Sequence, residues 1–376
     1  MLAPGLRSVM ATTTALGDTP ARVFPSGTWA RKQAHEVGLD VDKLSDFSRF
    51  VGGRGCVVRH GYLVHTWGDI GRRSDVASAA KPFYSHFLFK AVELGKIGGL
   101  DEKVARWEPR LGGRKRTPDR KQPARGSEAK RRGMLQDRRR INEHLGHPDA
   151  EITWRHLANQ TSCYQLVERP GTAFAYNDWQ MALLWDTLFL RVYRATYATV
   201  DAKVFRPLLT DKLGCQDRPT MMAFGTRDRP GRVAISVRDF ARFGLLYLRQ
   251  GNWNGVRLIG RHHARMAVSD PVPNRVPRAG YREAAMIPGQ RSIGSKARLD
   301  NPTDHFRSYS WLSWINGTYG EGNRFWPDAP VDTYGAFGHG GPRAMWSCRV
   351  TIWRSPTMMP LCMGGRAATM RRRTRP

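Results

Sequence analysis

The sequence has few cysteines and lacks the motifs that define the common metal, nucleotide and membrane classes. Its five cysteines lie far apart and form no Cys-x-x-Cys pair, which argues against a zinc site or a disulfide framework. No apolar run approaches the roughly 18 residues of a membrane span. The first 20 residues lack the compact apolar segment of a signal peptide. Patterns such as Gly-x-Ser-x-Gly, His-Glu-x-x-His, the Walker loop and Gly-x-Gly-x-x-Gly are absent, so the sequence predicts no metal, no cofactor and no membrane span.

Acidic residues are also scarce, and the charge imbalance is local. The chain carries 61 Lys and Arg against 32 Asp and Glu, a formal net charge of +29. Residues 112–140 contribute +9, and eight arginines but no acidic residue follow Asp332. Such basicity is typical of nucleic-acid-binding proteins, but no basic stripe interleaved with aromatic residues stands out. Nucleic-acid binding therefore stays an alternative, and we expect no specific nucleic-acid partner.

The hydrophobic pattern predicts strands at both ends of the chain and helices between them. Two β-rich runs around His60-Gly61 indicate a hairpin, and apolar residues recur at helical spacing after Ser78. The pattern therefore predicts an α+β fold, a sheet domain with an inserted helical domain. We expect helices at 41–51, 78–94, 178–193 and 237–250, a short helix after Thr153, and strands at 56–59, 62–67, 309–314 and 345–353. The expected domains are a tail (1–28), a sheet domain in two segments (29–98 and 302–376) and a mainly helical domain (99–301) with a disordered basic insert (112–140).

A Ser-x-x-Lys sequence, from Ser78 to Lys81, stands at the start of an expected helix. Residues three apart share a helix face, so the Lys81 ammonium can lie beside the Ser78 hydroxyl. The helix N-terminus supplies N–H groups where an oxyanion develops. Ser127 and Lys130 have the same spacing, but they lie in the basic insert, with no strand before them and no amphipathic helix after them. We therefore assign the nucleophile to Ser78.

Two further motifs follow in the chain. Tyr176-Asn177-Asp178 precedes an expected helix, and His339 stands between glycines after aromatic strand material. Each motif alone is an ordinary packing or turn sequence. Together with the Ser-x-x-Lys sequence, in this order and at these spacings, they are much more informative.

The three motifs resemble those of the serine beta-lactamase-related family, which includes class C beta-lactamases, D-alanyl-D-alanine carboxypeptidases and related esterases. The stretches 61–64, 93–101, 152–162 and 236–244 also resemble this family, so the resemblance covers roughly 38–345. It implies a mostly antiparallel sheet flanked by helices with an inserted helical domain, and it places Ser78 in the cleft between them. It also favours an extracytoplasmic location.

The resemblance implies a serine hydrolase that forms an acyl-enzyme on a small ester or amide substrate. Ser78 is then the nucleophile, and Lys81 and Tyr176 handle its proton. Free lysine is almost wholly charged at neutral pH. Either Lys81 is desolvated enough to act as the base, or it stays charged and stabilises a tyrosinate base at Tyr176, and both alternatives stay open here. The substrate or its oxyanion is expected to contact Asp178, His339, Gly340 and Gly341.

The sequence departs from the family pattern at four positions. Asp178 stands where the penicillin-recognising members have Asn, and His339 where they have Lys. Both changes favour neutral esters or amides over beta-lactam or D-alanyl peptide substrates. Cys163 replaces the usual glycine, and Pro342 has no N–H to offer an oxyanion.

Two segments depart from the pattern more strongly. The basic insert replaces a much shorter family loop, so we expect its deletion to leave the fold nearly unchanged. The resemblance fades after Met345, so we expect the C-terminal part to be incomplete, with a core strand missing and activity weak or absent. The main alternative is a catalytically silent relative that binds cell-wall or other ligands in the same cleft. The sequence does not indicate the oligomeric state.

Overall fold

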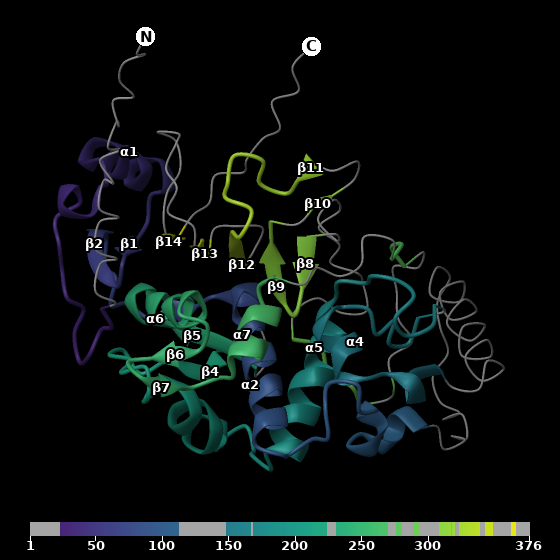
Figure 1. Cartoon of the computed structure of the whole chain (residues 1–376). Coiled ribbons are helices and arrows are strands. Elements are labelled where there is room, and N and C mark those ends of the chain that lie inside the picture. The colour runs from purple at the N-terminus through teal and green to yellow at the C-terminus, as the bar shows by residue number, and fades with distance from the viewer. Residues whose placement is uncertain are drawn as a thin grey trace, which may run out of the picture.

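The computed structural model describes residues 23–112, 148–166, 168–223, 231–269, 276–279, 287, 289–293, 308–316, 318–319, 323–338, 343–348 and 362–365. Within these ranges, strands from both ends of the chain form one antiparallel sheet, and helices occupy the middle of the sequence (Figure 1). The predicted α+β fold is therefore confirmed. In these ranges no helix is both long and apolar enough to cross a membrane. Most of the basic insert and its Ser127 lie outside the described residues.

The main sheet has the strand order β2-β1-β14-β13-β12-β9-β8, and neighbouring strands pair antiparallel. The predicted hairpin is present as β1 and β2, and Gly61 makes its turn with a φ of 98°, a conformation that glycine adopts without strain. The bounds of the seven strands are Gly55–Arg59 (β1), Tyr62–Trp67 (β2), Tyr309–Ser310 (β8), Ser313–Ile315 (β9), Tyr334–Gly338 (β12), Arg343–Ser347 (β13) and Cys362–Gly365 (β14).

Strand β14 corrects the expectation that a core strand is missing after Met345. It pairs with β1 on one side and with β13 on the other, and Cys362 lies opposite both Val57 and Trp346. The Cys-Met-Gly-Gly sequence of β14 has little β-propensity, so it gives no strand signal along the chain. Pairing with two neighbours, rather than local preference, accounts for the strand.

The last predicted strands also differ from the structure. The expected strand at 309–314 is a hairpin of β8 and β9, because Trp311 and Leu312 between them have φ values of 49° and 64°, which turn the chain. The strand expected at 345–353 is β13, which starts and ends earlier, at Arg343 and Ser347.

The helices agree more closely with the predictions. Those at 41–51 and 237–250 are confirmed as α1 (Val41–Val51) and α6 (Val237–Leu248). The helix expected at 178–193 is present as α5 (Asp178–Trp185), which continues with wider turns as η6 (Asp186–Val192). The remaining helices in the described residues are η1 (His35–Val37), η2 (Ala77–Ala80), α2 (Lys81–Glu93), η3 (Val104–Arg106), η4 (Pro109–Gly112), η5 (Pro148–Glu151), α4 (Trp154–Ala158), η7 (Asp201–Thr210) and α7 (Arg261–Met266). Smaller sheets are formed by β3 (Ser74–Asp75), β5 (Arg232–Ile235) and β4 (Thr220–Ala223), by β6 (Asn252–Trp253) and β7 (Val256–Arg257), and by β10 (Thr318–Tyr319) and β11 (Asn323–Arg324).

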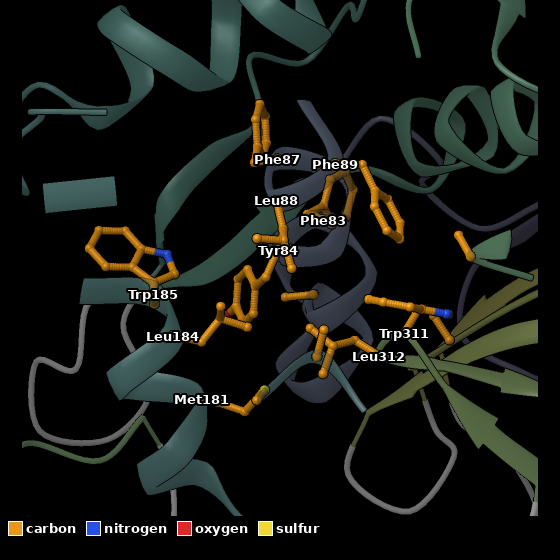
Figure 2. Close-up of a cluster of buried hydrophobic side chains, with 14 of the residues drawn as sticks. Phe83, Tyr84, Phe87, Leu88, Phe89, Met181, Leu184, Trp185, Trp311 and Leu312 are labelled. Carbon is orange, nitrogen blue, oxygen red and sulfur yellow. The ribbon is translucent and has the colours of Figure 1, made fainter. Parts of the chain in front are cut away.

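Helix α2, which carries Lys81 at its first position, is the centre of the core. In Figure 1 it runs through the middle of the molecule, with α6 on one side and α5 on the other. Figure 2 shows its aromatic side chains between Trp185, the last residue of α5, and Trp311 of the β8–β9 turn. Phe83 stacks on Phe243 of α6 with ring centroids 4.0 Å apart, a contact of about 0.5–1.5 kcal/mol beyond its buried area. The start of α2 is therefore held rigidly.

Candidate active site

The turn that carries Ser78 is a strained bend that leads directly into α2. Residues 77–80 form the single turn η2, and Lys81 is the first residue of α2. Ala77 has a φ of 53°, a left-handed conformation that costs a non-glycine residue about 1–2 kcal/mol. The Asp75 carboxylate accepts a hydrogen bond of 2.7 Å from the Ala77 N–H. Strain of this kind persists only where the surrounding structure enforces it, and it is common at functional sites.

Ser78 and Lys81 lie side by side on this turn. The Lys81 Nζ donates a hydrogen bond of 2.8 Å to the Ser78 Oγ. Lys81 is buried, whereas Ser78 keeps part of its surface exposed. The pair therefore combines a hydroxyl that a ligand can reach with an ammonium that water barely reaches.

Tyr176 and Asp178 complete the surroundings of the Lys81 ammonium. The Nζ also donates to Asp178 Oδ1 at 3.0 Å, and it lies 4.6 Å from the centroid of the Tyr176 ring. Burial, the largest single influence, lowers the pKa of Lys81, but the charge of Asp178 and the contacts with Tyr176 and Asp178 together outweigh it. The pKa of Lys81 is therefore raised above its ordinary value, and Lys81 is a cation at neutral pH.

Local sequence explains why Tyr176 and Asp178 lie together. Asn177 between them caps α5, and its Oδ1 accepts a 2.8 Å hydrogen bond from the Gln180 N–H, as cap residues do. Asp178 is therefore the first residue of the helix. The Tyr176 ring packs against Tyr309 and Trp314 of the β8–β9 hairpin, with centroid distances of 5.6 and 6.3 Å. Sheet and helices thus both contribute to the site.

Comparison with known proteins gives a clear result for the fold. No protein-family model matches the sequence, and neither does any curated protein. A solved structure provisionally assigned as a beta-lactamase, from Bacteroides dorei DSM 17855, is 15% identical and has a TM-score of 0.51, covering 82% of this chain and 85% of that one. A structure provisionally assigned as a 6-aminohexanoate-dimer hydrolase, from Bacillus anthracis, is 14% identical with a TM-score of 0.51, covering 92% of this chain and 81% of that one. The chain has the serine beta-lactamase fold.

Four of the residues singled out in the sequence meet in this serine beta-lactamase fold. Direct contacts join Lys81 to Ser78, to Asp178 and to the ring of Tyr176. The other expected substrate contacts, His339, Gly340 and Gly341, lie outside the described residues, as does Pro342.

The strand before His339 reaches the turn that carries Ser78. Gly338 is the last residue of β12. A Cβ built on it would overlap the carbonyl oxygen of Val76 and would lie 3.1 Å from the Cβ of Ala77. Only glycine fits such a close approach of two backbones. The end of β12 is therefore beside the turn that carries Ser78.

Cys163, which stands where the resemblance expects a glycine, has an unusual backbone conformation. Its φ is 48°, so the position requires a left-handed backbone, which glycine adopts at no cost. The Cys163 Sγ is buried and donates to the carbonyl oxygen of Ala173 at 3.3 Å. This thiol is therefore held by a polar partner.

Sequence reasoning missed three polar residues around the site. Asp75 accepts a hydrogen bond from the turn that carries Ser78, and the fully buried Gln160 and Gln180 contact the backbone next to Tyr176. No pattern marks the two glutamines, because glutamine is mostly a surface residue. Among the described residues, no cluster of three His, Cys, Asp or Glu side chains could hold a metal ion.

Proposed function

We propose that this protein is a serine hydrolase that cleaves neutral esters or amides through an acyl-enzyme on Ser78. The observation that carries the proposal is the contact between the partly exposed Ser78 hydroxyl and the buried Lys81 cation, which Asp178 and Tyr176 surround. The fold, shared with proteins that are named as hydrolases, supports the same reaction class.

The charge of Lys81 favours one of the two assignments of the base. An ammonium paired with Asp178 at 3.0 Å has no lone pair to accept the Ser78 proton. In this mechanism the Tyr176 oxygen accepts the proton, and Lys81 is a fixed cation beside the reacting oxygens.

Acylation and hydrolysis then follow in order. Ser78 Oγ bonds to the substrate carbonyl carbon while its proton passes to a Tyr176 oxyanion. Tyr176 returns that proton to the leaving alcohol or amine as the C–O or C–N bond breaks. Water attacks the acyl-enzyme, releases the carboxylic acid and restores the Ser78 hydroxyl.

Covalent labelling tests the nucleophile. A fluorophosphonate probe forms a P–O bond with an activated serine and loses fluoride, so intact-mass analysis reports one adduct. We expect the adduct on wild type and on Ser127→Ala, the matched Ser-x-x-Lys control, and none on Ser78→Ala. An unlabelled wild type contradicts the hydrolase and favours the catalytically silent alternative. Labelling that depends on Ser127 refutes the assignment of Ser78.

Mutant kinetics test whether Lys81 and Tyr176 act as one unit. Residues that act together show non-additive losses. The labelling rate should therefore fall by a similar factor, relative to wild type, in Lys81→Ala, in Tyr176→Phe and in the double variant. Losses that multiply in the double variant would show that the two residues act independently.

Asp178 is proposed to select against substrates with a carboxylate. A second anion about 6 Å away would meet repulsion of roughly 2–3 kcal/mol at an effective dielectric constant of about 20. Asp178→Asn should therefore raise the hydrolysis of a carboxylate-bearing p-nitrophenyl ester, relative to its neutral methyl-capped analogue, by tenfold or more. The ratio is taken within one variant, so a general loss of rate cancels. An unchanged ratio would refute this role.

A further inference from the structure

Two buried glutamines enclose the segment that carries Tyr176. Gln160 and Gln180 are both fully buried, which is unusual for glutamine. Gln180 Nε2 donates to Gln160 Oε1 at 2.6 Å, so the two amides are joined directly. We call this pair the amide clasp. Burying two amides costs free energy unless their polar atoms are hydrogen-bonded. Gln160 Nε2 has no partner among the described residues, whereas both amide oxygens and Gln180 Nε2 are bonded, so the role of the clasp is inferred from the partners of these three atoms.

The clasp bonds the peptide groups on both sides of Tyr176. On the near side, Gln180 Nε2 donates to the Ala175 carbonyl oxygen, and the Gln160 backbone carbonyl accepts from the Ala175 N–H at 2.8 Å. On the far side, Gln160 Oε1 accepts from the Asn177 N–H at 3.0 Å. Both neighbours of Tyr176 are therefore held by hydrogen bonds, while its ring packs against Tyr309 and Trp314.

Ser162, two residues after Gln160 in the loop that follows α4, extends the clasp. Gln180 Oε1 accepts a hydrogen bond of 2.6 Å from the Ser162 hydroxyl, and Ser162 Oγ accepts one of 3.2 Å from the Tyr164 N–H. Ser162 is fully buried as well. The network therefore ties the Tyr176 segment to the loop after α4.

We propose that Gln160 and Gln180 are positioning residues that hold Tyr176 and Asp178 around the Lys81 ammonium. The catalytic part of this inference rests on the proposed function. The two glutamines touch neither Ser78 nor Lys81 in the described contacts, so they act through the backbone of 175–178. A misplacement of about 1 Å at a reacting group reduces rates by about a hundredfold, so loosening this backbone should slow acylation of Ser78.

Labelling kinetics on near-isosteric variants test the proposal. Gln160→Met and Gln180→Met keep the volume of the side chain but remove its hydrogen bonds. We expect the fluorophosphonate labelling rate to fall by about tenfold to a hundredfold, at a temperature where each variant is fully folded by circular dichroism. Thr187→Val is the matched control, because Thr187 is fully buried in the continuation of the same helix and its Oγ1 makes no hydrogen bond in the described part of the chain. That variant should label at the wild-type rate. Equal rates for Gln180→Met and Thr187→Val overturn the proposal.

A conservative variant separates positioning from general stability. A protonated carboxyl group at position 180 can donate one of the two hydrogen bonds that Gln180 Nε2 makes, whereas a carboxylate only accepts. The labelling rate of Gln180→Glu, divided by that of wild type, should therefore rise as the pH falls. A ratio that stays constant over the pH range in which both proteins are folded counts against the clasp.

Hydrogen exchange gives a result that is independent of catalysis. The Asn177 amide proton is bonded to Gln160, so Gln160→Met should speed its exchange by at least tenfold, since opening no longer breaks that bond. If wild type is not labelled at all, the proposed function fails, and faster Asn177 exchange still supports the clasp. Unchanged exchange in Gln160→Met overturns the clasp whatever the labelling shows.

Discussion

The ion pair between Lys81 and Asp178 gives the sharpest test of the energetics of the site. The side chains are only 5% and 11% exposed, and the charged atoms are 3.0 Å apart. At an effective dielectric constant of about 20, this separation corresponds to an attraction of roughly 5 kcal/mol, which opposes the cost of burying both ions. Removing one partner leaves the other charge buried and uncompensated, which typically costs about 3–5 kcal/mol.

We therefore expect a strongly non-additive double-mutant cycle. Lys81→Met and Asp178→Asn should each lower the free energy of unfolding by about 3–5 kcal/mol. The double variant buries no charge, so it should lose at most about 3 kcal/mol, which leaves a coupling energy of about 3 kcal/mol or more. Urea denaturation at pH 7, followed by circular dichroism, measures all four proteins. Ser78→Ala is the control, since it removes one hydrogen bond of about 1 kcal/mol and no charge.

The pH dependence follows from the direction of the shift. The pKa of Lys81 is raised in the folded state. Its contribution to stability is therefore complete below the unfolded pKa of about 10.4 and is lost only as the pH rises through the higher folded value. The coupling energy should stay constant from about pH 6 to pH 9. Additive losses, within about 0.5 kcal/mol, would show that Asp178 does not stabilise the charge of Lys81.

Three further predictions concern stability. Burial lowers the pKa of His86 to about 3, so the free energy of unfolding of wild type should fall by up to about 5 kcal/mol as the pH falls from about 6.5 to 3. The double variant His86→Phe, Tyr247→Phe, which also removes the hydroxyl partner, should show a much smaller decrease in urea titrations. An equal decrease in the variant contradicts the prediction. Burial raises the pKa of Asp149 to about 6, so its ionisation lowers the free energy of unfolding as the pH rises from about 4 to about 6. Asp149→Asn should therefore raise the free energy of unfolding by up to about 3 kcal/mol at pH 8 and leave it unchanged below about pH 4. Equal gains at both pH values would exclude the ionisation of Asp149 as the cause. Ala77→Gly should relieve the left-handed strain and stabilise the protein by about 0.5–1 kcal/mol; a lower melting temperature would show that Ala77 is not strained.

Local sequence was sufficient to predict the parts of the site that depend on neighbouring residues. Spacing of three on one helix face placed Lys81 beside Ser78, and they are hydrogen-bonded at 2.8 Å. The boundary of α5 could also be predicted, since the helix expected from residue 178 begins at Asp178. The strand-and-helix context that favoured Ser78 over Ser127 was read from the same local patterns. The catalytic roles themselves stay predictions, and so do the domain boundaries.

Only the tertiary structure shows that the charge of Lys81 is kept on burial, and only it gives the order of the strands in the sheet. Asp178 is 97 residues away from Lys81 in the chain, and an ion pair depends on separation in space and on burial, neither of which periodicity encodes. The sequence therefore left the base undecided, whereas the geometry holds Lys81 as a cation. Strand β14 was missed for a related reason, since its place between β1 and β13 comes from backbone pairing that its own side chains do not signal. The amide clasp follows the same rule: glutamine has no local signature, and only the fold brings Gln160 and Gln180 together around Tyr176.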